Sequence, residues 1–121
     1  MTTQEIANRY KELEKLSNST EIHNQLYSAD AVSIEPEHAT QIGMAPLTKG
    51  MEAIRAKSVA FNENISEVHG GYSGEPVVGG NFFSLAMGME VTWKNGHRMK
   101  MDEIAVFGVK DDKIISEQFF Y

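Results

Sequence analysis

The stretch Phe82–Val109, FFSLAMGMEVTWKNGHRMKMDEIAVFGV, contains two long runs of alternating apolar residues with Asn95-Gly96 between them. This dipeptide is the strongest short signal for a β-hairpin, so the stretch predicts two paired strands. Side chains two positions apart share one face of a strand. The larger apolar face of the first strand, which we expect to contact helices, is Phe83, Leu85, Met87, Met89, Val91 and Trp93.

The second strand of this hairpin carries an acid on an otherwise apolar face. Its alternate positions are Met99, Met101, Glu103, Ala105, Phe107 and Val109, and those of the last stretch are Ile115, Glu117, Phe119 and Tyr121. An ionised carboxylate in a dry core costs several kcal/mol unless it is paired or hydrogen-bonded. We therefore predict that Glu103 and Glu117 face a polar cavity for a small molecule. The alternative is that Glu103 pairs with a Lys or Arg on a neighbouring strand.

The remainder of the chain predicts helices in the first half and strands in the second. Thr2 and Glu5 form a capping box, a second helix follows residues 17–20, and a third helix follows Gly50. Residues 31–35 indicate a short strand that Pro36 stops, and residues 36–49 indicate a loop. Further strands are predicted at about 66–75, 81–94, 97–110 and 113–121. This order favours an α+β domain, with the helices on one face of a mostly antiparallel sheet.

Length and composition narrow the class of protein. The chain has 121 residues, which suits one domain, and a formal net charge of -6, which argues against a nucleic-acid partner. No run of residues is long and apolar enough for a membrane span, and no signal peptide is recognisable, so we expect a cytoplasmic protein. There is no cysteine, and the four histidines lack a metal-binding spacing. His38 lies in the predicted loop beside Glu35 and His69 begins a predicted strand, so either could enter the pocket. We expect no cofactor and no metal.

The second face of the predicted hairpin is small and only moderately polar. It consists of Phe82, Ser84, Ala86, Gly88, Glu90 and Thr92, with Ile104, Val106 and Gly108 from the neighbouring strand. A smooth outer sheet face of this kind commonly supports a homodimer. The alternative is a solvated face without a partner.

Three short segments resemble the nuclear transport factor 2-like superfamily, and within it the SnoaL-like and ketosteroid-isomerase-like branch. They are YSADAV at residues 27–32, GMEAIR at residues 50–55 and DKII at residues 112–115. The resemblance covers essentially the whole chain and implies one SnoaL-like domain over residues 1–121. It also implies a cone-shaped, curved half-barrel with three helices packed on its concave face. These segments specify a fold better than a reaction.

The resemblance to ketosteroid isomerases assigns candidate site residues. Glu35, followed by Pro36, matches the position of the general base, and Tyr10 in Asn8-Arg9-Tyr10 matches a hydrogen-bond donor to the enolate. The second donor of the isomerases, an aspartic acid, aligns with Ala105, and Glu103 lies two residues away on the same face. The candidate catalytic residues are therefore Glu35, Glu103 and Tyr10. The candidate ligand-binding residues are Glu117, Tyr121, Phe119, Met101, Phe107, Trp93 and Phe61.

Two functions fit these residues. The first is a pocket for a small hydrophobic or amphipathic ligand in which an isomerase, cyclase or dehydratase moves a proton on a carbonyl compound. The second is a dimeric domain that binds a ligand or a protein without catalysis. Glu35 at an exposed strand end, or Tyr10 as an ordinary core residue, would fit the second function.

Overall fold

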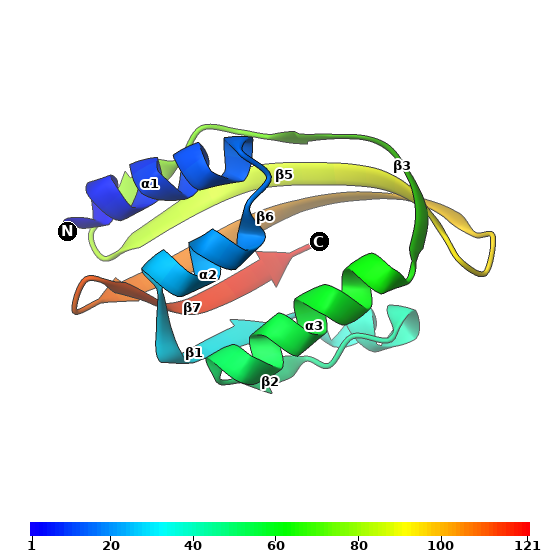
Figure 1. Cartoon of the computed structure of the whole chain (residues 1–121), viewed down its shortest axis with the longest axis horizontal. Coiled ribbons are helices and arrows are strands. Elements are labelled where there is room, and N and C mark those ends of the chain that lie inside the picture. The colour runs from blue at the N-terminus through cyan, green and yellow to red at the C-terminus, as the bar shows by residue number, and fades with distance from the viewer.

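A computed structural model describes all residues, 1–121, and contains three α-helices, one short 3-10 helix and seven strands. The elements are α1 (Thr3–Lys15), α2 (Ser19–Leu26), β1 (Tyr27–Ile34), η1 (Glu37–Ile42), β2 (Leu47–Lys49), α3 (Met51–Glu63), β3 (Ile65–Ser73), β4 (Val77–Gly79), β5 (Phe82–Trp93), β6 (Arg98–Lys110) and β7 (Lys113–Phe120). Figure 1 shows the helices in front of the long strands, which confirms the predicted α+β class.

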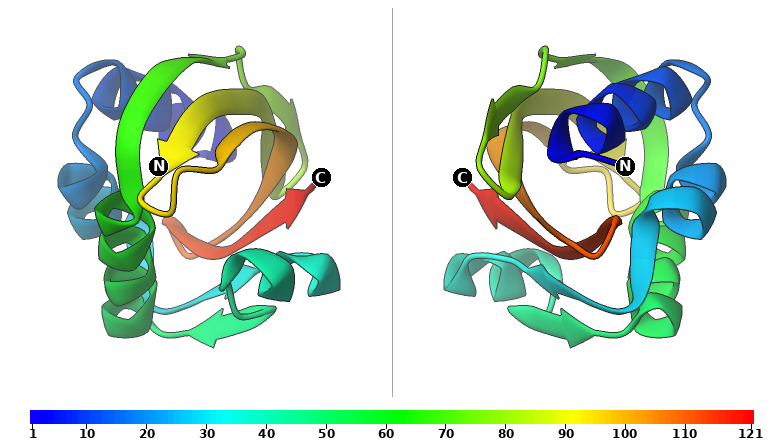
Figure 2. Two further views of the ribbon diagram at one scale, coloured as in Figure 1. Left: turned by 90° about the vertical axis from the view of Figure 1, so that its right-hand side faces the viewer. Right: turned by 90° about the vertical axis from the view of Figure 1, so that its left-hand side faces the viewer.

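The strands form one sheet in the order β2-β1-β7-β6-β5-β3, with β4 paired to β5. Every pair is antiparallel except β1 with β7. Seen end-on, the sheet is strongly curved and does not close, and the three α-helices lie along its concave side (Figure 2). The predicted half-barrel with three helices is confirmed.

The core forms where α1 and α2 meet the concave face of the sheet. Phe83 of β5 and Phe107 of β6 stack with their ring centroids 4.7 Å apart, and the ring of Tyr10 lies against both. The large apolar face of β5 points to the helices as predicted, because Phe83, Leu85 and Val91 are each at most 1% exposed. The capping box at the start of α1 is also present, with Thr2 and Glu5 bonded reciprocally at 3.1 and 2.9 Å. These contacts fix the helices over the cavity described below.

Several local predictions differ from the structure. The strand predicted at residues 31–35 begins at Tyr27, and the expected loop over residues 36–49 contains η1 and β2. The short strand β4 was not predicted. The hairpin turn uses three residues rather than two, because Trp93 donates a backbone hydrogen bond to His97 and Gly96 takes the left-handed conformation at φ 89°.

The prediction that Ile115 faces the same side as Glu117 is wrong. Gly108 pairs with Ser116 while Val109 pairs with Ile114, so Ile115 is an extra residue at a β-bulge. Ile114 is fully buried and Ile115 is 38% exposed. The predicted alternation of side chains therefore holds for Glu117, Phe119 and Tyr121, whereas Ile115 lies on the other face of the strand.

No α-helix of this fold combines the length and the apolar character that crossing a lipid bilayer requires.

Candidate functional site

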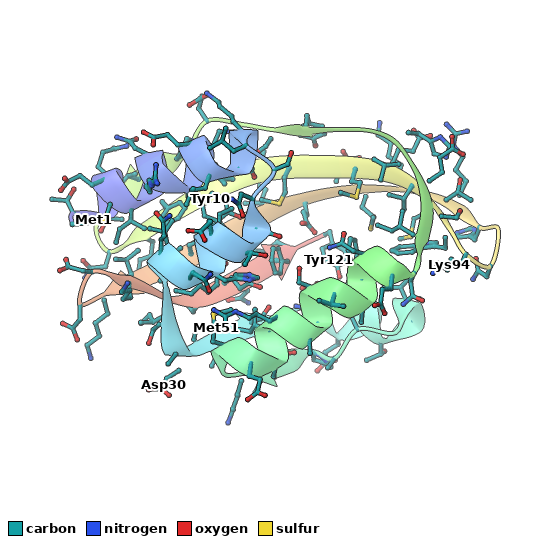
Figure 3. All side chains as sticks on the ribbon, in the orientation of Figure 1. Met1, Tyr10, Asp30, Met51, Lys94 and Tyr121 are labelled. Carbon is teal, nitrogen blue, oxygen red and sulfur yellow. The ribbon has the colours of Figure 1, made fainter.

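A cavity of about 490 Å³ lies between the helices and the concave face of the sheet. Among its lining residues are the predicted residues Tyr10, Glu35, Phe61, Met101, Glu103, Glu117, Phe119 and Tyr121. Two other candidates lie elsewhere. Phe107 is 1% exposed and packs in the core, and Trp93 borders a second hollow near the β5–β6 turn. Figure 3 shows Tyr10 between α1 and α2 and Tyr121 beside the upper part of α3 in that view, with the sheet behind them.

Glu117 of β7 is buried but has hydrogen-bond donors on both carboxylate oxygens. The hydroxyl of Tyr27 donates to Oε1, and the hydroxyl of Ser33 donates to Oε2 at 2.6 Å. Parallel pairing of β1 with β7 makes Ser33 the direct neighbour of Glu117, which explains the second contact. A buried carboxylate satisfied in this way no longer carries the full cost of desolvation.

Lys57 of α3 extends this arrangement to Glu35. Its ammonium group donates to Ser33 Oγ and to Glu35 Oε2, each at 2.7 Å. The hydroxyl of Tyr121 donates to the other oxygen of Glu35 at 2.7 Å. The result is one continuous series of hydrogen bonds, which we call the polar chain: Tyr27, Glu117, Ser33, Lys57, Glu35 and Tyr121.

Glu103 of β6 lines the same cavity without any partner. It makes no hydrogen bond to protein and no ion pair, so the predicted alternative of a neighbouring Lys or Arg is not seen, and its neighbour on β5 is Met87. The pKa of Glu103 is raised to about 7, mainly by burial and also by the charges of Glu35 and Glu117, while the charge of Lys57 lowers it. This carboxyl group can therefore gain or lose a proton near neutral pH.

Tyr10 offers a second free polar group. Its ring packs 4.9 Å from that of Phe107, but its hydroxyl has no hydrogen bond to protein. No fully buried side-chain nitrogen or oxygen lacks a partner, so this hydroxyl must border the cavity. Burial raises the pKa of Tyr10, and the charges of Glu14 and Glu117 add to this effect. The hydroxyl therefore keeps its proton at neutral pH and can act as a donor.

Sequence reasoning missed Tyr27, Ser33 and Lys57 as cavity residues. Two signals were available. Ser33 alternates with Ala31 and Glu35 and so shares their face, and Lys57 interrupts the apolar stripe of α3.

The histidines do not gather in the cavity. His38 is exposed and meets the ring of Tyr121 edge-on at 5.3 Å, while His69 bonds to Thr92 outside the cavity. His23, which was not a candidate, lines the cavity, and burial lowers its pKa. No group of three or more His, Asp or Glu side chains is placed to hold a metal ion.

Comparison with known proteins identifies the family. The sequence profile of the SnoaL-like domain matches residues 1–121. A crystal structure from Mesorhizobium loti, of a protein described as a candidate SnoaL-like polyketide cyclase, is 37% identical, covers 100% of both chains and has a TM-score of 0.89. No curated protein matches the chain.

More distant structures share the fold alone. A protein with a ketosteroid isomerase-like fold from Catenulispora acidiphila, in complex with trimethylamine, has 17% identity and a TM-score of 0.65 over 83% of this chain and 72% of its own. An NTF2-like protein from Burkholderia pseudomallei has 14% identity and a TM-score of 0.79 over 100% of this chain and 92% of its own. With its profile match from end to end, the chain belongs to the SnoaL-like domain family.

Proposed function

We propose that the protein binds a small hydrophobic carbonyl compound in this cavity and that Glu103 transfers a proton to and from it. One observation carries the proposal. Four carboxyl groups line the cavity, and Glu103 alone has neither a hydrogen bond nor an ion pair, because Glu14 is paired with Lys11 and the other two belong to the polar chain.

The reaction follows from the two free polar groups. In the ionised form, Glu103 removes a proton from the carbon next to the carbonyl group, and the electrons of the broken C–H bond move to the carbonyl oxygen. The hydroxyl of Tyr10 donates a hydrogen bond to this developing enolate oxygen. In an isomerisation, Glu103 then returns the proton to another carbon. In a cyclisation, the enolate carbon instead attacks a second carbonyl carbon of the ligand, whose oxygen takes the proton from Glu103. In a dehydration, the enolate expels a hydroxyl group, which takes that proton and leaves as water.

Glu35 has a different role in this proposal. Its two oxygens accept hydrogen bonds from Lys57 and Tyr121, so both are already bonded within the cavity wall. We propose that Glu35 positions Lys57 and Tyr121 at the cavity wall. The expectation from the isomerases that Glu35 is the general base remains a prediction, and Glu35→Gln tests it.

The relatives support a carbonyl substrate. The Mesorhizobium loti protein is described as a candidate polyketide cyclase, and polyketides are carbonyl compounds. The apolar side chains around Glu103, including Met101 and Phe119, favour a hydrophobic substrate.

The test is hydrogen exchange at carbon. The ketones nonan-2-one and tetralone are incubated with the protein in heavy water, and loss of the proton signals beside the carbonyl group is followed by NMR. We expect Glu103→Gln to slow the exchange on the order of 100-fold or more, and Glu67→Gln, an exposed carboxyl on β3, to leave it unchanged. In the wild type the rate should rise with pH through the Glu103 pKa of about 7.

A pocket that only binds ligands predicts a different result. Bound ketone without accelerated exchange, or exchange that persists in Glu103→Gln, would remove Glu103 from any reaction and favour the non-catalytic function.

We also propose that the outer face of the sheet forms a homodimer. Ile104 is 51% exposed between its neighbours Ala86 and Phe120, and Phe120 and Phe82 are 51% and 56% exposed. Light scattering should show a dimer for the wild type and a monomer for Ile104→Lys. Leu16→Lys, at an exposed apolar residue beyond α1, should remain a dimer. A monomeric wild type would end this proposal.

A further inference from the structure

A second hollow, of about 820 Å³, adjoins the cavity of Glu103. It lies between α3, the segment that contains η1 and β2, and the turn of the β5–β6 hairpin, and these elements meet at one end of the molecule in Figures 1 and 2. We call this hollow the vestibule and define it by Ala53, Ala56, Ala60, Trp93, Lys94 and His97. The cavity and the vestibule adjoin each other, because three residues line both: Met44, Lys57 and Phe61.

The boundary between the two hollows is formed by Met44, Lys57 and Phe61, and the ammonium group of Lys57 is held by Glu35. The ring of Phe61 contacts that of Trp93 edge-on, with centroids 5.5 Å apart. Beyond this contact, α3 presents three alanines to the vestibule, at positions 53, 56 and 60. Such small side chains leave room for a chain or ring that passes Phe61 from the cavity. A single ligand can therefore extend from Glu103 into the vestibule.

The two hollows differ in charge. Four glutamates line the cavity, whereas no Asp or Glu lines the vestibule, although the whole protein has 17 acidic and 11 basic residues. The basic residues that line the vestibule are Lys57, Lys94 and His97. Lys57 is already paired with Glu35, whereas Lys94 has no ion-pair partner in the protein. Figure 3 places Lys94 beside the hairpin turn at the same end of the molecule. A positive, acid-free rim favours an anionic group on the ligand.

We propose that the ligand is an elongated amphipathic keto acid whose ketone lies at Glu103, whose apolar chain passes Phe61, and whose carboxylate lies at Lys94. The position of the ketone rests on the proposed function. The vestibule, by contrast, is tested by binding alone.

Three probes test the ligand class. They are oxodecanoate with a methyl ketone at one end and a carboxylate at the other, its neutral primary amide, and the six-carbon homologue of the acid. Trp93 is the one tryptophan of the chain, so its fluorescence reports occupancy of the vestibule, and calorimetry measures affinity independently. We expect the ten-carbon acid to bind about threefold more tightly than the amide, as for an exposed ion pair. The six-carbon acid, with four fewer buried methylenes, should bind at least about tenfold more weakly and leave Trp93 fluorescence unchanged.

Variants identify the residues that bind the carboxylate and the apolar chain of the ligand. Lys94→Gln should bind acid and amide equally, whereas Lys100→Gln, an exposed lysine of β6 outside the vestibule, should keep the threefold preference. Ala56→Phe should weaken the ten-carbon acid at least about tenfold and leave the six-carbon acid unchanged.

The results that would contradict the keto-acid ligand differ from those that would contradict proton transfer by Glu103. Equal affinity of the wild type for acid and amide, binding without a change in Trp93 fluorescence, or no binding at about 1 mM would overturn the inference. Glu103→Gln should still bind the ten-carbon acid, so loss of proton exchange with intact binding concerns the reaction only.

Discussion

Glu35, Glu103 and Glu117 lie on two walls of the cavity, but only the two on one wall accept hydrogen bonds from the protein. The wall made by β1, β7 and α3 contains Glu117 and Glu35, and every oxygen of these two carboxylates accepts a hydrogen bond. The wall made by β5 and β6 contains Glu103 beside Met87, with no donor within reach. Burial alone therefore does not distinguish a hydrogen-bonded carboxylate from one without a partner. The distinction comes from what the neighbouring strand and helix supply.

The largest effect on stability should come from removing the ammonium group of Lys57 from the polar chain. In Lys57→Met the aliphatic part of the side chain is kept, but Glu35 loses its counter-ion and Ser33 loses a donor. Because a buried charge is left without its partner, we expect a loss of about 3 kcal/mol in the free energy of unfolding. Urea denaturation measures this value. Lys49→Met, at an exposed lysine of β2, should change it by less than about 0.5 kcal/mol. Similar values for the two variants would mean that the polar chain does not stabilise the fold.

A pair of tyrosines should give the next largest difference. Tyr27→Phe removes a donor to Glu117, and we expect a loss of about 2 kcal/mol in the free energy of unfolding. Tyr10→Phe removes a hydroxyl that has no protein partner, so stability should stay within about 0.5 kcal/mol of the wild type. Thermal and urea unfolding of both variants measure the contrast. If Tyr10→Phe is the more destabilising variant, the hydroxyl of Tyr10 has a structural role.

The smallest effect should appear in the pH dependence of stability. The pKa of Glu103 is raised from 4.5 to about 7 on folding, so between these values the folded state binds more protons than the unfolded state. Stability of the wild type should therefore fall as the pH rises through this window, and Glu103→Gln should not show this fall. Because Glu103 is partly exposed, we expect the variant to be about 1 kcal/mol more stable at pH 8.

A measurement at pH 4 serves as the internal control, since Glu103 is then mostly neutral in both the folded and the unfolded wild type. Parallel stability curves for the wild type and Glu103→Gln from pH 5 to pH 8 would show that the carboxyl group is not desolvated.

Strand periodicity was enough to place the acids. Alternation in β6 put Glu103 on the inner face, and alternation in β7 from Glu117 to Tyr121 did the same for the opposite wall. It failed at Ile115, because a β-bulge depends on how two strands pair and leaves no mark in either strand alone.

The partners of the acids could not be predicted in the same way. Contact between Ser33 and Glu117 depends on the parallel register of two strands that are distant in the sequence. Lys57 reaches Glu35 only because α3 crosses the concave face at that point. Trp93 shares an inward face with cavity residues, but it is the last residue of β5 and borders the vestibule instead. Periodicity gives the face of a strand, whereas tertiary placement decides which neighbours meet there.

The parallel pairing of β1 with β7 also has a consequence for how the site assembles. Ser33 lies beside Glu117, so the two residues that meet are separated by most of the chain, and β7 must insert between β1 and β6 before they do. Contacts of such long sequence separation close slowly. During synthesis Tyr27 and Ser33 are therefore made long before Glu117, and their bonds to its carboxylate form only after β7 has left the ribosome.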